Sequence, residues 1–450
     1  MTHVFAQSAL TPSGWQQNVR IGFDNNAITD IRTDATPISG DECHSIILPG
    51  MPNLHSHAFQ RGMAGLAESR GPGSDSFWSW RNVMYRFALT MTPDQVEAVA
   101  AQLYMEMLEA GFIRVGEFHY LHHDTDGQPY ANIAEMAERI AAAASQTGIG
   151  LTLLPVFYAH STFGGAEPSE GQRRFINSLD SYEKIHAGCL DAIKALPGGN
   201  VGVAPHSLRA VIPDELAAVT AIAGRNPKHI HVAEQVKEVE DCIAWSGARP
   251  VEWLLRHAGI DETWCLIHAT HMTDDEISAM ARTGAVAGLC PTTEANLGDG
   301  TFSADLFAQA GGRLGIGSDS NVLIGIADEL RQLEYSQRLA HRSRNVLAPA
   351  GGSTGRSIFD HAVHGGGTAL GVETGLAVGR PADFISIQPQ TAAIFSGDLA
   401  LDSWIFANGA KINSTWVSGI KQVEGGRHKL RDQIEGQFGK VMKELVSATP

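Results

Sequence analysis

Two histidines stand two positions apart in the segment HSH at residues 55–57. The apolar run IILPGMPNL precedes them and a polar, glycine-rich stretch follows, so we expect them where a buried strand ends. Side chains two positions apart on a strand point to the same face. His55 and His57 could therefore bind one metal ion if other segments supply further ligands. On their own they could equally be two hydrogen-bonded loop histidines.

Three other short apolar runs end in residues that can bind a metal ion. HIHVAE contains His229 and His231, of which His231 lies nearer the strand end, so we predict His231 as a ligand and His229 as a core residue. WCLIH ends in His268, with His271 just beyond, and RLGIGS leads into Asp319. The HSH pair, one further histidine and one carboxylate would suit Zn²⁺ and also admit iron, manganese or cobalt. Such an ion lowers the pKa of a bound water toward neutrality.

These ligands need a scaffold that brings the ends of distant strands together. Eight short runs, most of them apolar on both faces, alternate with helical patterns, as in parallel sheets covered by helices. The sequences TPDQ at 92–95 and TDDE at 273–276 are typical helix-capping segments. This order predicts an α/β fold with a (β/α)₈, TIM-like barrel, whose active site forms at the carboxyl ends of the strands. The predicted strands lie in 46–57, 112–120, 150–158, 200–207, 228–234, 264–270, 285–291 and 313–319.

The two ends of the chain have a different pattern. Residues 1–45 and the region 375–450 contain short β-like runs separated by turn glycines, and we predict that they form one small β-sandwich domain. Residues 46–374 would form the metal-dependent barrel domain. The segment after Arg427 has helical spacing and should pack on one of the two domains.

The composition excludes several classes of partner. The chain has 450 residues, 43% of them hydrophobic, and a formal net charge of −16, which argues against binding to nucleic acids or anionic membranes. We find no secretory signal and no apolar run long enough to span a membrane. The five cysteines are scattered, without a CxxC motif, as in reduced proteins. We therefore expect a cytoplasmic protein that acts on a small molecule.

Several motifs resemble the amidohydrolase superfamily, and the resemblance covers the whole chain. PGMPNLHSH is similar to its first-strand signature, and GLAVGRPADFISI and VSGIKQVEGG are similar to its split β-domain. Members with two metal ions carry a lysine at the end of strand four, where this chain has APHSLR. The resemblance therefore implies one metal ion per subunit, held by His55, His57, His231 and Asp319.

HVAE and CPTTEANLGDG are similar to the deaminating branch of the superfamily. Within that branch, HSHAFQRGMAG, GEFHYLHHD and APHSLRAV resemble the members that act on N-formimino-L-glutamate. The resemblance implies a homodimer, most simply with Zn²⁺, that hydrolyses this compound to N-formyl-L-glutamate and ammonia in histidine degradation. Asp319 would accept a proton from the attacking water, Glu234 would protonate the leaving nitrogen, and His268 would orient the water and stabilise the tetrahedral intermediate.

The two carboxylates of such a substrate require cations and hydroxyl groups. Residues in the loops after strands one, two and four could supply them, and Arg209 is the first choice for direct contact. Without the resemblance, Arg81 could simply pack beside two tryptophans, and Arg209 could form a salt bridge with Asp214 or Glu215. The predicted substrate-binding residues are Gln60, Arg81, Tyr120, His206 and Arg209.

Two other functions stay open at this point. Another mononuclear deaminase of the same branch would act on a guanine-, cytosine- or triazine-like ring, and a barrel without activity would serve as a scaffold, although such a barrel should have lost ligands. The motifs also do not separate formimino-glutamate from formimino-aspartate, because the single methylene between them is worth only about 1–3 kcal/mol in a pocket.

Two further clusters have weaker links to chemistry. The segment HHD at 122–124 contains potential ligands, but it follows strand two in a loop, so we expect it to be solvated or to lie behind the metal site. The glycines of HGGG at 364–367 are similar to an oxyanion loop. We nevertheless do not expect a serine hydrolase.

Overall fold

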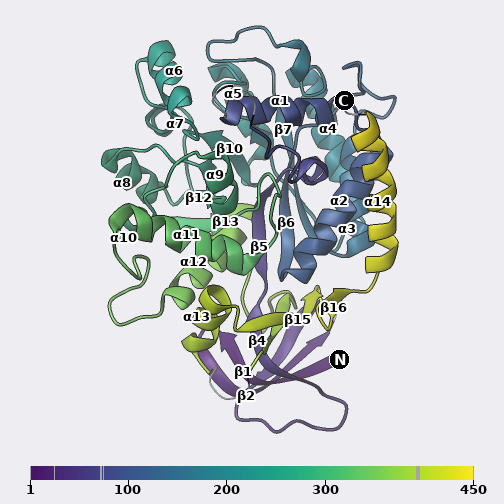
Figure 1. Cartoon of the computed structure of the whole chain (residues 1–450), viewed down its shortest axis with the longest axis vertical. Coiled ribbons are helices and arrows are strands. Elements are labelled where there is room, and N and C mark those ends of the chain that lie inside the picture. Colours follow the sequence, from purple (N-terminus) through teal and green to yellow (C-terminus); the bar gives the residue numbers. More distant parts are fainter. Residues whose placement is uncertain (1, 25, 71–72, 74–75, 392–395, 449–450) are drawn as a thin grey trace.

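The computed structural model describes residues 2–24, 26–70, 73, 76–391 and 396–448. A barrel of strands and helices forms the larger part, and a sheet from both ends of the chain lies at its base (Figure 1). The predicted fold class, a (β/α)₈ barrel with a small β-domain, is confirmed.

Each of the eight predicted strand regions contains at least one barrel strand, and the fourth is divided into two short ones. Parallel pairing joins the first four regions into one sheet and the last four into another. Parallel bridges connect these sheets into a closed ring: Val203 with Lys228 and Ser207 with His231 on one side, and Ser56 with Asp319 on the other. The strands are β5 (Met51–Ser56), β6 (Phe112–His119), β7 (Gly150–Phe157), β8 (Asn200–Val201), β9 (Ala204–Pro205), β10 (Lys228–Val232), β11 (Trp264–His268), β12 (Val286–Leu289) and β13 (Arg313–Ile316).

Helices surround the barrel, and several begin where the sequence predicts a cap. In the cap before Pro93, Thr92 Oγ1 accepts a hydrogen bond from Gln95 N and Gln95 Oε1 accepts one from Thr92 N. Thr273 and Glu276 form the same reciprocal cap. The helices are α1 (Phe77–Ala88), α2 (Pro93–Glu109), α3 (Glu135–Thr147), α4 (Leu179–Ala192), α5 (Pro213–Ala223), α6 (Val236–Ser246), α7 (Pro250–His257), α8 (Asp274–Thr283), α9 (Pro291–Leu297), α10 (Ala304–Gln309), α11 (Ile326–His341), α12 (Thr354–Leu370), α13 (Asp398–Ala407) and α14 (Arg431–Ala448).

The sheet at the base combines strands from both ends of the chain. β4 pairs in parallel with β1 and antiparallel with β14, so it joins the N-terminal strands to the C-terminal ones. The strands, in their order across the sheet, are β17 (Arg427–His428), β16 (Ile420–Glu424), β15 (Ala410–Val417), β14 (Phe384–Pro389), β4 (Glu42–Pro49), β1 (Thr2–Thr11), β2 (Gly14–Asp24) and β3 (Ala27–Arg32).

The boundary between this sheet and the barrel differs from the expected position at residue 46. The apolar run 46–57 is divided at Gly50, so that residues up to Pro49 belong to the sheet and the barrel strand begins at Met51. A Cβ atom at Gly50 would lie 2.3 Å from the Ile113 side chain, so only glycine lets the chain pass this point without displacing its neighbour.

Two C-terminal features show how helices pack on the barrel. α14 lies beside α2 (Figure 1), where Gln95 Nε2 donates to Glu444 Oε2 at 3.0 Å.

The HGGG glycines lie in α12, and a Cβ atom at Gly365 would lie 1.9 Å from Leu314 O. These glycines therefore allow close helix–strand packing, and the likeness to an oxyanion loop has no structural counterpart.

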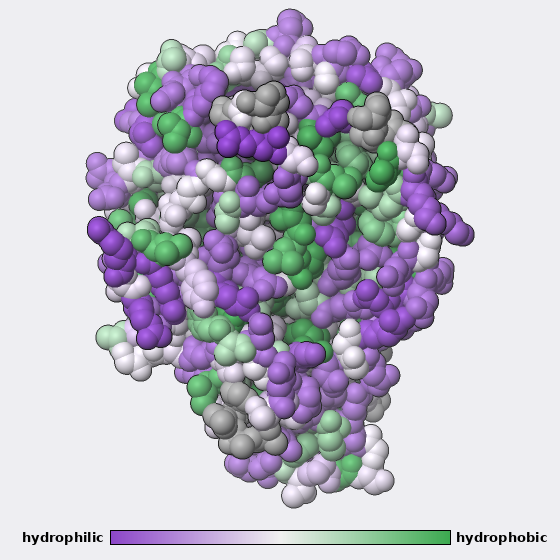
Figure 2. All heavy atoms as spheres, in the orientation of Figure 1, coloured by the Kyte–Doolittle hydropathy of each residue, from purple (hydrophilic) through white to green (hydrophobic). Residues whose placement is uncertain are grey.

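Hydrophilic side chains predominate on the face shown in Figure 2, and hydrophobic ones show between them near its middle. This agrees with the large excess of acidic over basic residues in the chain. Among the described residues, every helix is too short or too polar to cross a membrane.

Candidate metal centre and active-site pocket

Four side chains from three strand ends converge at the mouth of the barrel. Their donor atoms, on His55, His57, His231 and Asp319, all lie within 4.8 Å of one another. Nε2 of His231 is 3.1 Å from Nε2 of His55. Oδ1 of Asp319 is 3.3 Å from Nε2 of His55 and 3.2 Å from that of His57. Ligands bound at about 2.0–2.1 Å to a tetrahedral ion lie about 3.3–3.4 Å apart, so the four atoms are spaced to share one cation.

Hydrogen bonds on the far side of two rings fix which nitrogen faces the site. Nδ1 of His57 lies 3.0 Å from Phe118 O, and Nδ1 of His231 lies 3.1 Å from His206 O. A carbonyl oxygen can only accept, so each Nδ1 carries the proton and each Nε2 presents a lone pair to the centre. Lone pairs and a carboxylate packed this closely repel one another without a cation between them, and the residues therefore fit a metal ion.

Burial keeps the rings in the form that a metal ion requires. Burial lowers the pKa of His55 to about 3, although Asp319 acts in the opposite direction. Burial also lowers the pKa of His231 well below its ordinary value, and the neighbouring histidines add to this effect. Neutral imidazoles are the ligand form of histidine, so these two rings need no deprotonation before metal binding.

The ligands are held together where the last strand region meets the first. Asp319 N donates to His55 O at 3.0 Å, and His57 N donates to Asp319 O at 3.1 Å. Asn321 Nδ2 bridges the same segments by donating to His57 O at 3.0 Å and to Asp319 O at 2.8 Å. Asp319 itself has a φ of 44°, a left-handed conformation that costs energy for a residue with a side chain. The network holds the carboxylate in this conformation.

His268 stands beside the proposed ligands within a group of carboxylates. Its Nδ1 is 3.2 Å from Glu294 Oε1, and its Nε2 is 3.7 Å from Asp319 Oδ2 and 3.8 Å from Glu234 Oε1. Burial opposes a charge on His268, but these carboxylates, Glu234 foremost, raise its pKa to about 10. His268 is therefore a buried cation next to Asp319, in a position to donate hydrogen bonds.

Sequence reasoning missed Glu294 as a functional residue. It lies on α9, within the CPTTEANLGDG segment, and its Oε1 also accepts a hydrogen bond from Cys290 N at 2.9 Å. The sequence pointed to Glu294 only through the resemblance of CPTTEANLGDG to the deaminating branch. A single glutamate on a short helix does not indicate which histidine it will contact.

Glu234 is held at the end of β10 by a second carboxylate. Glu238 accepts hydrogen bonds from Ala233 N and Glu234 N, both at 3.2 Å, where Ala233 has a φ of 52°. Burial raises the pKa of Glu234 above its ordinary value, and His268 and Arg209 oppose that rise. A raised pKa makes a carboxyl group better able to take up a proton and pass it to a basic atom.

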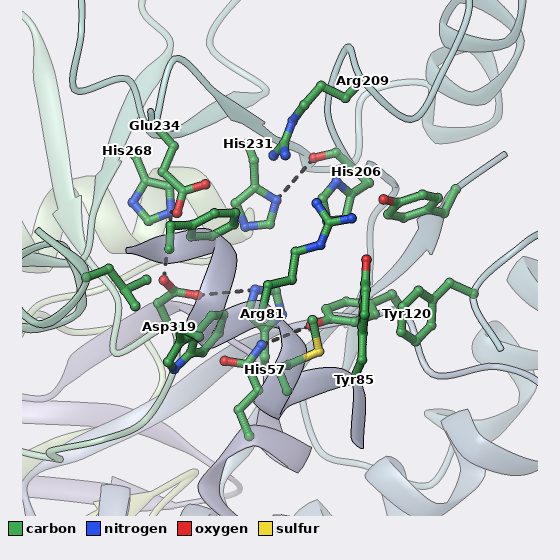
Figure 3. A pocket seen from close by; sticks show the side chains of 17 residues that line it. His57, Arg81, Tyr85, Tyr120, His206, Arg209, His231, Glu234, His268 and Asp319 are labelled. Atoms are coloured by element: carbon green, nitrogen blue, oxygen red, sulfur yellow. Dashed lines mark hydrogen bonds and ion pairs between the residues drawn. The ribbon is translucent and has the colours of Figure 1, made fainter. Parts of the chain in front are cut away.

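These groups line a cavity at the mouth of the barrel. Glu234, His268 and Asp319 face one end of it, and Arg81, Tyr85, Tyr120 and His206 face the other (Figure 3). The cavity wall includes all five predicted substrate-binding residues: Gln60, Arg81, Tyr120, His206 and Arg209.

Arg209 lines the cavity and forms no ion pair among the described residues. Its alternative partner Glu215 pairs with His160 at 3.1 Å, and Asp214 is exposed to solvent. Within the described residues, Nε of Arg209 has no hydrogen-bond partner although it is buried. Burial opposes the charge of Arg209, but Glu238 and Glu234 hold its pKa above the ordinary value. The guanidinium is thus charged and can bind an anion.

The other predicted contacts come from the first two loops. Arg81, on α1, lies over the rings of Trp78 at 5.4 Å and Tyr85 at 5.0 Å while it also faces the cavity. It therefore packs on aromatic rings and remains available to a ligand at the same time. Gln60 Nε2 donates to Tyr120 Oη at 2.9 Å.

The remaining histidines named from the sequence lie outside the metal cluster. His229 is buried in the core with Nε2 2.8 Å from Ala369 O, as expected. His271 Nε2 contacts Asp299 O at 2.9 Å. His122 and His123 are only 2% and 5% exposed, so the expectation of a solvated segment is wrong for them. Their rings face the backbone oxygens of Val156 and Ile176, at 2.9 and 2.8 Å, and hold the loop in place.

Comparisons with known proteins agree with this geometry. The sequence model of the amidohydrolase family matches residues 46–421. The chain belongs to the amidohydrolase family. Residues 1–45 match the N-terminal domain of the formimidoylglutamate deiminase HutF, so the family assignment extends to both domains.

The amidohydrolases most similar to this chain include one curated enzyme and two solved structures. Formimidoylglutamate deiminase from Pseudomonas aeruginosa is 50% identical over 99% of this chain and 100% of its own. An amidohydrolase from Brucella melitensis is 62% identical, with a TM-score of 0.97 over 99% of this chain and 100% of that one. Atrazine chlorohydrolase TrzN from Arthrobacter aurescens, solved with zinc, is 19% identical, with a TM-score of 0.83 over 98% and 100% of the two chains. This last likeness concerns the fold alone.

Proposed function

We propose that this amidohydrolase is a formimidoylglutamate deiminase, which hydrolyses N-formimino-L-glutamate to N-formyl-L-glutamate and ammonia in histidine degradation. One observation carries the proposal: the pocket that holds the hydrolytic groups is also lined by Arg209, whose buried Nε has no hydrogen-bond partner among the described residues. A small molecule that carries both a formimino group and carboxylates matches these two sets of groups. The 50% identity to the P. aeruginosa enzyme over both full lengths supports the same substrate.

We propose one Zn²⁺ per subunit, held by His55, His57, His231 and Asp319. Three imidazoles and one carboxylate form a nitrogen-rich donor set that suits zinc. The structures of TrzN and of an adenosine deaminase from Xanthomonas campestris, both similar in fold, were solved with zinc. An ion at this position would lower the pKa of a water to near neutrality and supply Lewis acidity at the reacting carbon.

The side chains around this position can move the protons of the reaction. Asp319 Oδ2, which faces His268 rather than the ligand histidines, accepts a proton from the attacking water as its oxygen bonds to the formimino carbon. His268, as a buried cation, donates hydrogen bonds to the same oxygen and stabilises the tetrahedral intermediate. The formimino group enters as the amidinium, so the intermediate carries one hydroxyl and one NH₂ group. Glu234 then donates a proton to the terminal nitrogen, and the C–N bond breaks with release of ammonia. The hydroxyl returns its remaining proton to Glu234 as it becomes the formyl C=O, and the proton on Asp319 passes to the released ammonia.

The other end of the pocket binds and orients the substrate. Arg209 and Arg81 pair with its two carboxylates, and a guanidinium can form two parallel hydrogen bonds to one carboxylate. Tyr120, His206 and Gln60 add polar contacts from the same wall. A site with two guanidiniums favours a dicarboxylate over a neutral ring, since a ring would offer these cations no anionic partner.

We also propose a cytoplasmic location and a homodimer. Cys189, Cys242, Cys265 and Cys290 are buried and free, and Cys43 is exposed and free. An exposed free thiol persists best in a reducing compartment. The dimer rests on the family resemblance, and a mass measurement of the native protein in solution tests it.

The function is tested by measuring ammonia release from a panel of compounds on one purified sample. We expect turnover of N-formimino-L-glutamate, weaker turnover of N-formimino-L-aspartate, and none of guanine, cytosine or an amino-triazine. Ammonia from a ring compound but not from N-formimino-L-glutamate would overturn the proposal.

A further inference from the structure

One polar residue of the pocket wall has no assigned role so far. Tyr158 follows the last residue of β7, lines the cavity and is 7% exposed. Its ring centroid lies 4.5 Å from that of His206. The next residue, Ala159, donates from its N to Ala210 O at 2.9 Å, so the segment that carries Tyr158 lies beside the one that carries Arg209.

A fully buried glutamine holds the Tyr158 hydroxyl from behind. Gln172 has no exposed surface, and its Nε2 donates to Tyr158 Oη at 2.7 Å. The orientation of this amide is fixed, because Ser169 N donates to Gln172 Oε1 at 2.7 Å and Ser169 Oγ also donates to it at 3.0 Å. A backbone N–H can only donate, so the atom that it meets is the amide oxygen, and the NH₂ group faces Tyr158.

This direction of donation decides what Tyr158 can offer to a ligand. A phenol hydroxyl has a single proton, and Gln172 already supplies the proton of their shared hydrogen bond. The hydroxyl therefore keeps its own proton, and no acceptor for it is recorded in the part of the chain that the structure describes. A buried donor without a partner is costly, so an acceptor inside the cavity would be favourable.

The similar pair of Gln60 and Tyr120 lacks this constraint. Gln60 Nε2 donates to Tyr120 Oη at 2.9 Å, but Gln60 Oε1 has no partner among the described residues. Its amide can turn over and accept the proton of Tyr120 instead. Tyr158 is thus the tyrosine whose role as a donor is fixed by the protein itself.

We propose that Tyr158 donates a hydrogen bond to one carboxylate of the substrate, beside Arg209, and that Gln172 is the positioning residue that fixes this hydroxyl as a donor. The inference deepens the proposed function and rests on it. A carboxylate, which only accepts hydrogen bonds, fits a guanidinium and a hydroxyl donor side by side.

The first test is Tyr158→Phe, assayed by ammonia release. A hydrogen bond to a charged group predicts that kcat/KM for N-formimino-L-glutamate falls about 10- to 100-fold. Tyr182→Phe is the matched control, since Tyr182 Oη donates to Pro155 O at 2.9 Å outside the cavity. We expect Tyr182→Phe to keep kcat/KM, and thermal unfolding of each variant shows whether it is folded.

Two substrate analogues separate a carboxylate contact from a structural role. N-formimino-4-aminobutyrate lacks the α-carboxylate, and N-formimino-2-aminobutyrate lacks the side-chain carboxylate. If Tyr158 binds one carboxylate, Tyr158→Phe should have no effect on the analogue that lacks that carboxylate. On the analogue that keeps it, the loss of kcat/KM should persist. Analogues that turn over too slowly are compared as competitive inhibitors, through their inhibition constants. Equal losses on both analogues, or no loss on the parent substrate, would overturn the inference.

Gln172→Glu tests the direction of the hydrogen bond. A carboxylate at this position would accept the proton of Tyr158, so that the hydroxyl would present only lone pairs to the substrate. We expect at least a 10-fold loss of kcat/KM in the otherwise unchanged enzyme, and a smaller loss in the Tyr158→Phe background. Equal losses in both backgrounds would show that Gln172 does not act through the hydroxyl.

The two proposals fail in different ways. If the unaltered enzyme releases no ammonia from N-formimino-L-glutamate, the proposed function is wrong. If the unaltered enzyme is active and Tyr158→Phe matches it, only the role of Tyr158 is wrong.

Discussion

Replacement of Arg209 by methionine tests how the pocket recognises an anion. Methionine keeps much of the aliphatic volume and removes the charge and all five N–H donors. The guanidinium is buried and has an unpaired Nε, so a bound carboxylate would be its main partner. The ligand histidines do not contact the Arg209 side chain in any recorded hydrogen bond of the described residues, and metal content should stay unchanged.

The expected loss follows from the contacts that the side chain can make. Two charge-assisted hydrogen bonds to a carboxylate contribute about 1.5–3 kcal/mol each, and water recovers part of this when they are lost. A net loss of about 3–4 kcal/mol corresponds to a reduction of kcat/KM by roughly 10²- to 10³-fold, at about 1.4 kcal/mol per factor of ten. Most of the loss should appear as a raised KM, because the carboxylate is bound equally before and during the reaction.

The assay is steady-state ammonia release, with two control variants. Arg209→Lys keeps a charge but loses the planar fork, so it should retain more activity than Arg209→Met. Arg282→Met removes an exposed arginine at the end of α8 and should have no effect. An Arg209→Met enzyme with unchanged kcat/KM would refute the placement of a substrate carboxylate at Arg209.

The remaining predictions concern the reacting end of the pocket. His268→Asn should retain the fold and bound metal while ammonia release nearly ceases, and normal turnover in a folded, metal-containing sample would remove His268 from catalysis. Glu234→Gln should lower kcat by about 10²- to 10⁴-fold, the usual worth of a positioned proton donor, and an unchanged kcat would exclude that role. Asn321→Ala removes two hydrogen bonds that hold His57 and Asp319 together, so metal affinity, measured by competition with a chelator, should fall about 10- to 100-fold. Equal affinities for the variant and the parent would show that the site does not depend on Asn321.

The barrel and the convergence of ligands were predictable from the sequence for a physical reason. Strands buried on both faces are apolar throughout, so each ends where a polar residue first appears, and in a closed parallel barrel all these ends meet. We predicted His231 rather than His229 as a ligand only because His231 lies nearer the carboxyl end of the strand. The structure places His229 in the core. The sheet extends beyond residue 46 to Pro49, which the sequence did not indicate because the apolar run continues through Gly50 into the barrel strand.

The parts of the site that the sequence did not predict depend on loops and tertiary packing. Glu294 reaches His268 from a short helix, and Gln172 reaches Tyr158 from a loop that no periodic pattern describes. His122 and His123 are polar residues in a loop, a pattern typical of exposed residues, yet backbone oxygens satisfy their rings in the interior. Such contacts arise only when the fold places distant segments side by side.

The central claim is that one metal ion, held by four side chains at the mouth of the barrel, enables this chain to release ammonia from N-formimino-L-glutamate. The most direct measurement is a titration of chelator-treated protein with Zn²⁺, with activity and bound metal determined on the same samples. We expect ammonia release to rise in proportion to bound zinc and to reach its maximum at one ion per chain. Full activity in metal-free protein, or a maximum that requires two ions per chain, would contradict it.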